Sequence, residues 1–168
     1  KALVECNGRT LLEYAITKLK YFGFSEVIVN VHHFSTQIID FVASRDFGIP
    51  ISISDETEQL FDTGGGLLYA KHFLDGDEPF LICNVDIVSS IDFSDMMQYH
   101  KEHKALATLA VSNRKTSRYL LFDENNQLCA WENKATNSII IANERVNYTP
   151  LAFSGIQIIS PEMFQYIT

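Results

Sequence analysis

Two short motifs in this 168-residue chain carry residue types suited to binding a metal ion or phosphate. The first is Asn84-Val85-Asp86, which directly follows the apolar run 80–83. In open α/β sheets, ligands gather beyond the carboxyl ends of the strands. A carboxylate at that position can hold a hard cation such as Mg²⁺, with substrate phosphates supplying further oxygen ligands. The alternative is that Asp86 only caps the following turn, as aspartate often does.

The second motif is the glycine triplet Gly64–Gly66, which we expect to precede a helix at 67–73. Glycines let a ligand approach the backbone, and a helix N-terminus offers unpaired N–H groups to an anion. The spacing matches neither the dinucleotide-binding fingerprint nor the P-loop. A tight turn without a ligand therefore remains an alternative. Lys1 precedes an extended segment and carries no signal by itself.

Other reactive residue types are interpreted as structural. His32 and His33 end a β-branched run, but no cysteine or third histidine has metal-ligand spacing around them. His100 and His103 lie three residues apart on an expected helix and are assigned to its solvated face. Cys83 is assigned to the core because no basic group adjoins it in the sequence.

The elements that would position these motifs alternate between strand and helix over the first two-thirds of the chain. Thr10-Leu-Leu-Glu13 has the capping-box spacing, so a helix should begin there, and Ser35 is expected to cap a second one. Later segments are short strands between polar turns, typical of an antiparallel meander. Strands are expected at 2–5, 26–31, 49–54, 79–84, 105–111, 119–122, 128–131, 138–142 and 151–159, and helices also at 67–73, at 93–104 and after Pro161. This order predicts an α/β fold with a Rossmann-like, doubly wound, mostly parallel sheet and a small antiparallel β insertion.

Composition narrows the class of protein. Apolar residues make up 46% and charged residues 20%, which is ordinary for a globular domain. The net charge is −8, from 13 basic and 21 acidic residues, so the chain should repel nucleic acid and anionic membranes. No apolar run approaches the roughly 20 residues of a membrane helix. The three widely spaced cysteines predict reduced thiols and a cytoplasmic location.

Taken together, the ordered motifs resemble a known family. They are Lys1-Ala-Leu-Val-Glu5, Val29-Asn-Val-His-His33, Asp62-Thr-Gly-Gly-Gly66, Asn84-Val-Asp86 and Phe153-Ser-Gly-Ile156. Their order and spacing are similar to those of the sugar-1-phosphate nucleotidyltransferases, above all the mannose-1-phosphate guanylyltransferase-like and N-acetylmuramate-1-phosphate uridylyltransferase-like proteins. The resemblance covers nearly the whole chain.

The resemblance implies an enzyme that transfers a nucleoside monophosphate from a nucleoside triphosphate, UTP or GTP, to a sugar-1-phosphate and releases pyrophosphate. It implies Mg²⁺ as cofactor, held by Asp86, and a lysine, Lys1, that reaches the nucleotide phosphates. The remaining implied roles are nucleotide binding by Thr63, Gly64 and Asn84, and sugar binding by Ser154 and Gly155.

The family pattern also has parts that this sequence does not contain. We expect one nucleotidyltransferase domain over residues 1–168, without the glycine-rich loop that precedes the lysine in the family and without its C-terminal part. A non-catalytic, nucleotide-sugar-binding regulatory subunit and a metal-dependent glycosyltransferase are the alternative functions. Assembly into homo-oligomers is left open.

Overall fold

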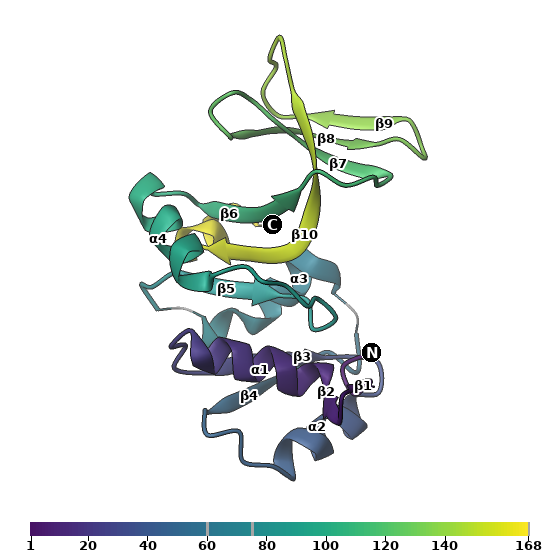
Figure 1. Cartoon of the computed structure of the whole chain (residues 1–168), viewed down its shortest axis with the longest axis vertical. Helices are drawn as coiled ribbons and strands as arrows, with labels where there is room; N and C mark the ends of the chain where they lie inside the picture. Colours follow the sequence, from purple (N-terminus) through teal and green to yellow (C-terminus); the bar gives the residue numbers. More distant parts are fainter. Residues whose placement is uncertain (60, 75, 168) are drawn as a thin grey trace. The chain divides into compact units, whose positions relative to one another are not determined.

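The computed structural model describes residues 1–59, 61–74 and 76–167, which divide into two compact units (Figure 1). Unit 1 consists of Lys1–Thr108 and Ile158–Thr168, and unit 2 of Leu109–Gln157. β6 (Ala107–Ser112) and β10 (Thr149–Ile159) each have residues in both units. β10 pairs with β5, β6 and β7.

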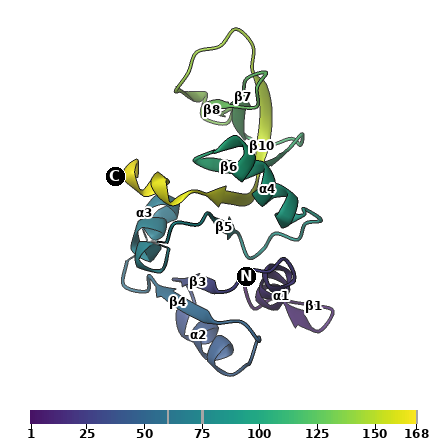
Figure 2. The same ribbon diagram turned by 90° about the vertical axis from the view of Figure 1, so that its left-hand side faces the viewer.

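Unit 1 contains the alternating helices and strands that the sequence predicts, except that the strand expected at 2–5 is wrong: Ala2 and Leu3 lie in a turn. Its parallel pair is β3 (Val27–Val31) with β4 (Ile51–Asp55), and α2 (Ser35–Ala43) packs beside both strands (Figure 2). The β-branched run of β3 suits a buried parallel strand, and Val27 and Val31 are buried. The other elements of unit 1 are β1 (Glu5–Cys6), β2 (Arg9–Thr10), α1 (Leu11–Tyr21), α3 (Asp62–Tyr69), the 3₁₀ helix η1 (Ala70–Phe73), β5 (Phe80–Cys83), α4 (Phe93–His103) and the 3₁₀ helix η2 (Pro161–Gln165).

The predicted capping box at the start of α1 is confirmed. The Thr10 hydroxyl accepts a hydrogen bond from Glu13 N at 3.2 Å, and the Glu13 carboxylate accepts one from Thr10 N at 2.7 Å. Two N–H groups at the helix start are thereby satisfied. Leu12, Ile16 and Leu19 then recur at helical spacing and form the buried face of the helix.

Two predicted helix starts are wrong. Ser35 does not cap α2; it is the first helical residue, and the N-cap is Phe34, which has a left-handed backbone at φ 57° and makes no side-chain cap. α3 begins at Asp62 rather than after the glycines, so Gly64–Gly66 lie inside the helix. Glycine is a poor helix former, so contacts with the rest of unit 1 must offset its cost of roughly 0.5–1 kcal/mol per residue.

A buried histidine joins three segments of unit 1. His100 is 1% exposed, which corrects its assignment to a solvated helix face. Its Nδ1 lies 2.8 Å from Thr108 Oγ1 and its Nε2 lies 2.9 Å from Ser160 Oγ, while that serine donates to Ala105 O. Because the Ser160 proton is used on Ala105, Nε2 must carry the ring proton and Nδ1 must accept. This arrangement fits the neutral ring.

We expect His100 to make folding stability depend on pH. Burial lowers the pKa of His100 below its ordinary value of 6.5, with opposing charge effects from Glu162 and Lys101. The unfolded chain therefore binds a proton at a higher pH than the folded chain does. The stabilising contribution is fully present above about pH 6.5 and is lost as the pH falls. Urea unfolding between pH 5 and 7.5 should show this slope.

The matched comparison uses two glutamine variants. His100→Gln should flatten the slope, whereas His103→Gln, on the exposed side of α4, should leave it unchanged. An equal slope in all three proteins would contradict the assignment to His100.

Unit 2 is the predicted antiparallel insertion. Its strands are β7 (Arg118–Phe122), β8 (Leu128–Asn133), β9 (Ser138–Ile141), the last part of β6 and the first part of β10. β7 pairs with β8 and β10, and β8 pairs with β9, all antiparallel. The core of this unit is formed by Leu121, Phe122, Cys129, Ala130, Ala152 and Ile156.

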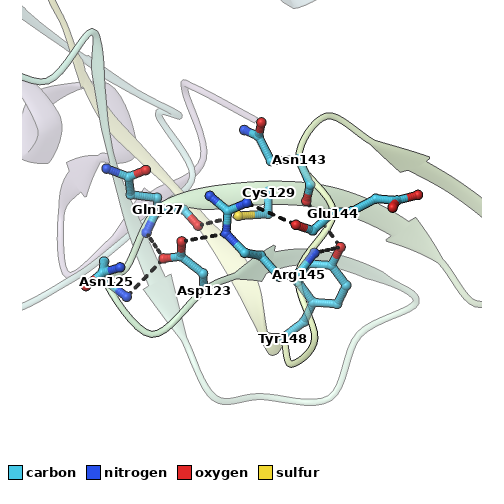
Figure 3. A network of polar contacts seen from close by, with 8 residues as sticks. All are labelled: Asp123, Asn125, Gln127, Cys129, Asn143, Glu144, Arg145 and Tyr148. Carbon is cyan, nitrogen blue, oxygen red and sulfur yellow. Dashed lines mark hydrogen bonds and ion pairs between the residues drawn. The ribbon is translucent and has the colours of Figure 1, made fainter.

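An ion-paired turn secures the connection between β9 and β10 (Figure 3). The Asp123 carboxylate accepts from the N–H groups of Asn125 and Gln127 and from Arg145 Nε at 3.2 Å. The Gln127 N–H bond is the main cause that holds the pKa of Asp123 below its ordinary value, so the carboxylate is ionised at neutral pH. Tyr148 accepts from Arg145 N and donates to a carbonyl of the same connection. The aspartate thus closes the β7–β8 turn and fixes this connection.

Candidate functional site

Asp86 lies in a turn directly after β5, where the sequence predicts it. Asn84 O accepts a hydrogen bond from Ile87 N at 3.1 Å, which closes the turn Asn84–Ile87. The side chains of Asn84 and Asp86 are both solvent-accessible. The half-buried strand β5 therefore presents an amide and a carboxylate at an exposed position at its carboxyl end.

Lys1 and Asp86 are 85 residues apart in the sequence and meet in space. Lys1 Nζ donates to Asp86 Oδ2 at 3.0 Å, with side-chain exposures of 81% and 37%. The hydrogen bond and the positive charge of Lys1 hold the pKa of Asp86 below its ordinary value, although partial burial raises it. Asp86 is therefore ionised at neutral pH. An ammonium and a carboxylate lie side by side, a combination suited to a phosphate group that carries a divalent cation.

The donor chemistry at Asp86 fits Mg²⁺ as part of a site completed by a substrate. The carboxylate supplies the oxygen ligand that a hard cation prefers, and its exposure allows an ion to reach it. No group of three or more His, Cys, Asp or Glu side chains in the described part of the chain could hold a metal ion. The other ligands would come from phosphate oxygens and water, as is usual for Mg²⁺ in nucleotide enzymes.

The three glycines of the triplet differ in the space around them. A Cβ atom at Gly65 would lie 2.8 Å from Phe61 Cβ, and one at Gly66 would lie 2.5 Å from Glu56 Oε1. Internal packing therefore excludes side chains at both positions. Gly64 is exposed, and its nearest contact would be Ile167 Cγ2 at 3.9 Å. Of the three glycines, Gly64 is the one whose backbone a ligand could approach. The side chain of Thr63, which the sequence also predicts for the site, lies outside the described part.

The two sugar-site residues predicted from the resemblance lie in β10, within unit 2. Ser154 Oγ donates to Ser112 Oγ at 3.5 Å, a long hydrogen bond between β10 and β6. Gly155 is buried and has φ 75°, a left-handed conformation that favours glycine. In unit 1, the structure brings two of the predicted site residues together: the side chains of Lys1 and Asp86 are in contact.

Sequence reasoning missed a buried carboxylate at the carboxyl end of β4. Glu56 is 3% exposed, and its Oε1 accepts from Asn30 Nδ2 at 2.8 Å. It lies within the polar run Asp55-Glu-Thr-Glu58, where no residue is distinguished by type or spacing. Ser54 and Glu56 are two residues apart and both are buried, but this alternation shows only in the structure, because both residues are polar. Cys83, which the sequence assigned to the core, is half-buried, and its burial raises the pKa of the thiol while the charge of Lys18 opposes this.

Comparison with protein families gives one assignment that covers most of the chain. The profile of the MobA-like NTP transferase domain matches residues 1–148. None of the helices in the parts of the chain described above is long and apolar enough to cross a membrane.

Two curated relatives match almost the entire chain. A probable mannose-1-phosphate guanylyltransferase 1 of Oryza sativa subsp. japonica is 27% identical over 99% of this chain and 46% of its own length. The N-acetylmuramate alpha-1-phosphate uridylyltransferase of Neisseria meningitidis serogroup B is 28% identical over 99% of this chain and 69% of its own length. The chain thus spans about half of the rice protein.

A solved structure extends the likeness to three dimensions. The structure of HddC from Yersinia pseudotuberculosis in complex with GMP-PN matches this chain with a TM-score of 0.74 and 18% sequence identity. The match covers 96% of this chain and 68% of the HddC chain. The fold is that of the nucleotide-diphospho-sugar transferases, as predicted from the sequence.

Proposed function

Because this chain belongs to the MobA-like NTP transferase family, we propose that it is the core of a nucleotidyltransferase that joins a nucleoside monophosphate to a sugar-1-phosphate. The observation that carries the proposal is the Lys1–Asp86 pair, an ammonium and an ionised carboxylate 3.0 Å apart, with Asp86 in the turn after β5. The relatives' names, a mannose-1-phosphate guanylyltransferase and an N-acetylmuramate alpha-1-phosphate uridylyltransferase, support GTP or UTP as the nucleotide. We assign the reaction to the cytoplasm, in agreement with the free thiols of Cys6, Cys83 and Cys129.

The reaction needs little covalent chemistry from the protein. A phosphate oxygen of the sugar-1-phosphate attacks the α-phosphorus of the triphosphate, an O–P bond forms, and the bond to the β-phosphate oxygen breaks with release of pyrophosphate. The nucleophile is already an anion, so no strong general base is required. Positioning and charge neutralisation supply the acceleration.

Each proposed residue acts through position or charge. Asp86 would hold Mg²⁺, which when bound neutralises and orients the phosphates. Lys1 would place its positive charge against the phosphates, and Asn84 would support Asp86 or bind a ribose hydroxyl. Thr63 and the accessible backbone of Gly64 would contact the nucleoside.

Ser154 and Gly155 of β10 would contact the sugar. Gly155 is buried and its left-handed backbone favours glycine by itself, so this role rests on the family resemblance.

The test is pyrophosphate release by the complete natural polypeptide that contains these residues. UTP, GTP, CTP, ATP and dTTP are each combined with mannose-, glucose-, N-acetylglucosamine- and N-acetylmuramate-1-phosphate, with Mg²⁺ or with EDTA. We expect release with one preferred pair, GTP or UTP being the nucleotide, and loss of release in EDTA. Binding of nucleotide sugar without release from any pair would instead indicate the regulatory subunit, and free nucleoside diphosphate would indicate a glycosyltransferase.

A further inference from the structure

Glu56 is a buried carboxylate that the proposed reaction does not use. The ion pairs found among the described residues do not include it, although it is almost inaccessible to solvent. A buried charge without a cationic partner costs free energy unless hydrogen bonds compensate it. Its hydrogen-bond partners therefore indicate what the carboxylate does.

The contacts of Glu56 connect the end of β3 with the residue that precedes α3. Oε1 accepts from Asn30 Nδ2 at 2.8 Å, and Oε2 accepts from Phe61 N at 3.4 Å. The main chain of Glu56 adds two bonds on the β3 side, from its N–H to Val31 O at 2.8 Å and from His32 Nδ1 to its carbonyl oxygen at 2.6 Å. One residue thus holds the last part of β3 and the N-terminus of α3 together.

The helix packs directly on this carboxylate. A Cβ atom at Gly66 would lie 2.5 Å from Glu56 Oε1 and 3.0 Å from Asn30 Nδ2. The absence of a side chain at Gly66 lets the helix backbone reach the polar pair. A negative charge at the start of a helix also stabilises it through the helix dipole. The contact explains how a segment with three consecutive glycines is helical.

We propose that Glu56 is a positioning residue: with Asn30, it fixes the start of α3 and thereby presents the backbone of Gly64 to the nucleotide. The proposal rests on the function proposed above, in which Gly64 contacts the nucleoside. The carboxylate acts through α3, and Gly66 provides the close approach that this requires.

The first experiment measures hydrogen exchange of the α3 amides in the complete polypeptide, without nucleotide. Glu56→Gln keeps the size of the side chain but removes its charge and places an amide group beside the Phe61 N–H or Asn30. We expect exchange in α3 to become about tenfold faster, with β3 and β4 unchanged. Glu58→Gln, an exposed neighbour in the same segment, is the control and should behave as the wild type.

The second experiment separates the two substrates in the pyrophosphate assay. Glu56→Gln should raise KM for the nucleoside triphosphate about tenfold and leave KM for the sugar-1-phosphate unchanged. Gly66→Ala should raise KM for the nucleoside triphosphate at least as much, because its methyl group would clash with Glu56 Oε1. Combining Gly66→Ala with Glu56→Asp shortens the acidic side chain, so the double variant should be less impaired than Gly66→Ala alone.

Exchange and nucleotide KM equal to wild type in Glu56→Gln would overturn the proposal. So would unchanged exchange together with a changed choice of base, which would mean that Glu56 contacts the base itself. If the wild type releases no pyrophosphate with any pair, the proposed function fails, and the exchange experiment still decides whether Glu56 orders α3.

Discussion

Replacing Asp86 with asparagine is expected to lower kcat for pyrophosphate release by about a thousandfold, equivalent to roughly 4 kcal/mol of transition-state stabilisation. Asparagine has nearly the same shape but lacks the negative charge that attracts Mg²⁺. The proposed ligand is a carboxylate whose pKa the Lys1 hydrogen bond holds below its ordinary value, so its charge is present at neutral pH. The measurement is a Mg²⁺ titration of the initial rate, in which the variant should need much more metal.

The control for this prediction is Asp77→Asn, an exposed aspartate in the segment before β5. It removes the same charge from the chain without touching the turn after β5. Equal rates and equal Mg²⁺ requirements in Asp86→Asn and the wild type would exclude Asp86 as the metal ligand.

Replacing Lys1 with glutamine is expected to lower kcat by about a hundredfold, the usual effect of removing one charge-stabilising donor from an active site. The Mg²⁺ requirement should remain, because the carboxylate is still there. The ammonium is also the first cause of the lowered Asp86 pKa, so that pKa should rise toward its ordinary value in the variant. Nuclear magnetic resonance titration of the Asp86 carboxyl measures this shift independently of activity.

Lys101 supplies a matched control because it forms a comparable surface ion pair, with Glu78 at 2.9 Å. Exposed pairs of this kind contribute about 0–1 kcal/mol to stability, so neither lysine variant should unfold the protein. A Lys1→Gln enzyme as active as Lys101→Gln would show that Lys1 is not needed for phosphate transfer.

The sequence predicted a helix start correctly where the residues that cap the helix lie close together in the chain. The Thr10–Glu13 capping box is such a case, because both partners lie within one helical turn. The predicted cap at Ser35 was wrong because the N-cap is Phe34, which has a left-handed backbone. Phenylalanine rarely adopts this conformation, so the sequence did not indicate it. The alternation of strand and helix, followed by short hairpins, was enough to predict the α/β class and the antiparallel insertion.

The site was predictable only in part because its contacts are not local. Asp86 could be recognised from the apolar run before it, but its partner Lys1 is 85 residues away and has no signal of its own. Family resemblance, rather than spacing, indicated that lysine. Glu56 could not be recognised at all, because its burial depends on β3 pairing with β4 and on α3 covering the polar pair. Tertiary contacts there also overrode the low helix propensity of the glycines.

The close approach between Gly66 and Glu56 also bears on which substitutions this protein can tolerate as it diverges. Every amino acid reached by a single-base change from a glycine codon carries a Cβ atom, and at position 66 that atom would lie 2.5 Å from a buried carboxylate oxygen. A change at 66 therefore needs the side chains of Glu56 and Asn30 to shift or to become shorter. Positions 30, 56 and 66 should vary together among descendants of this sequence.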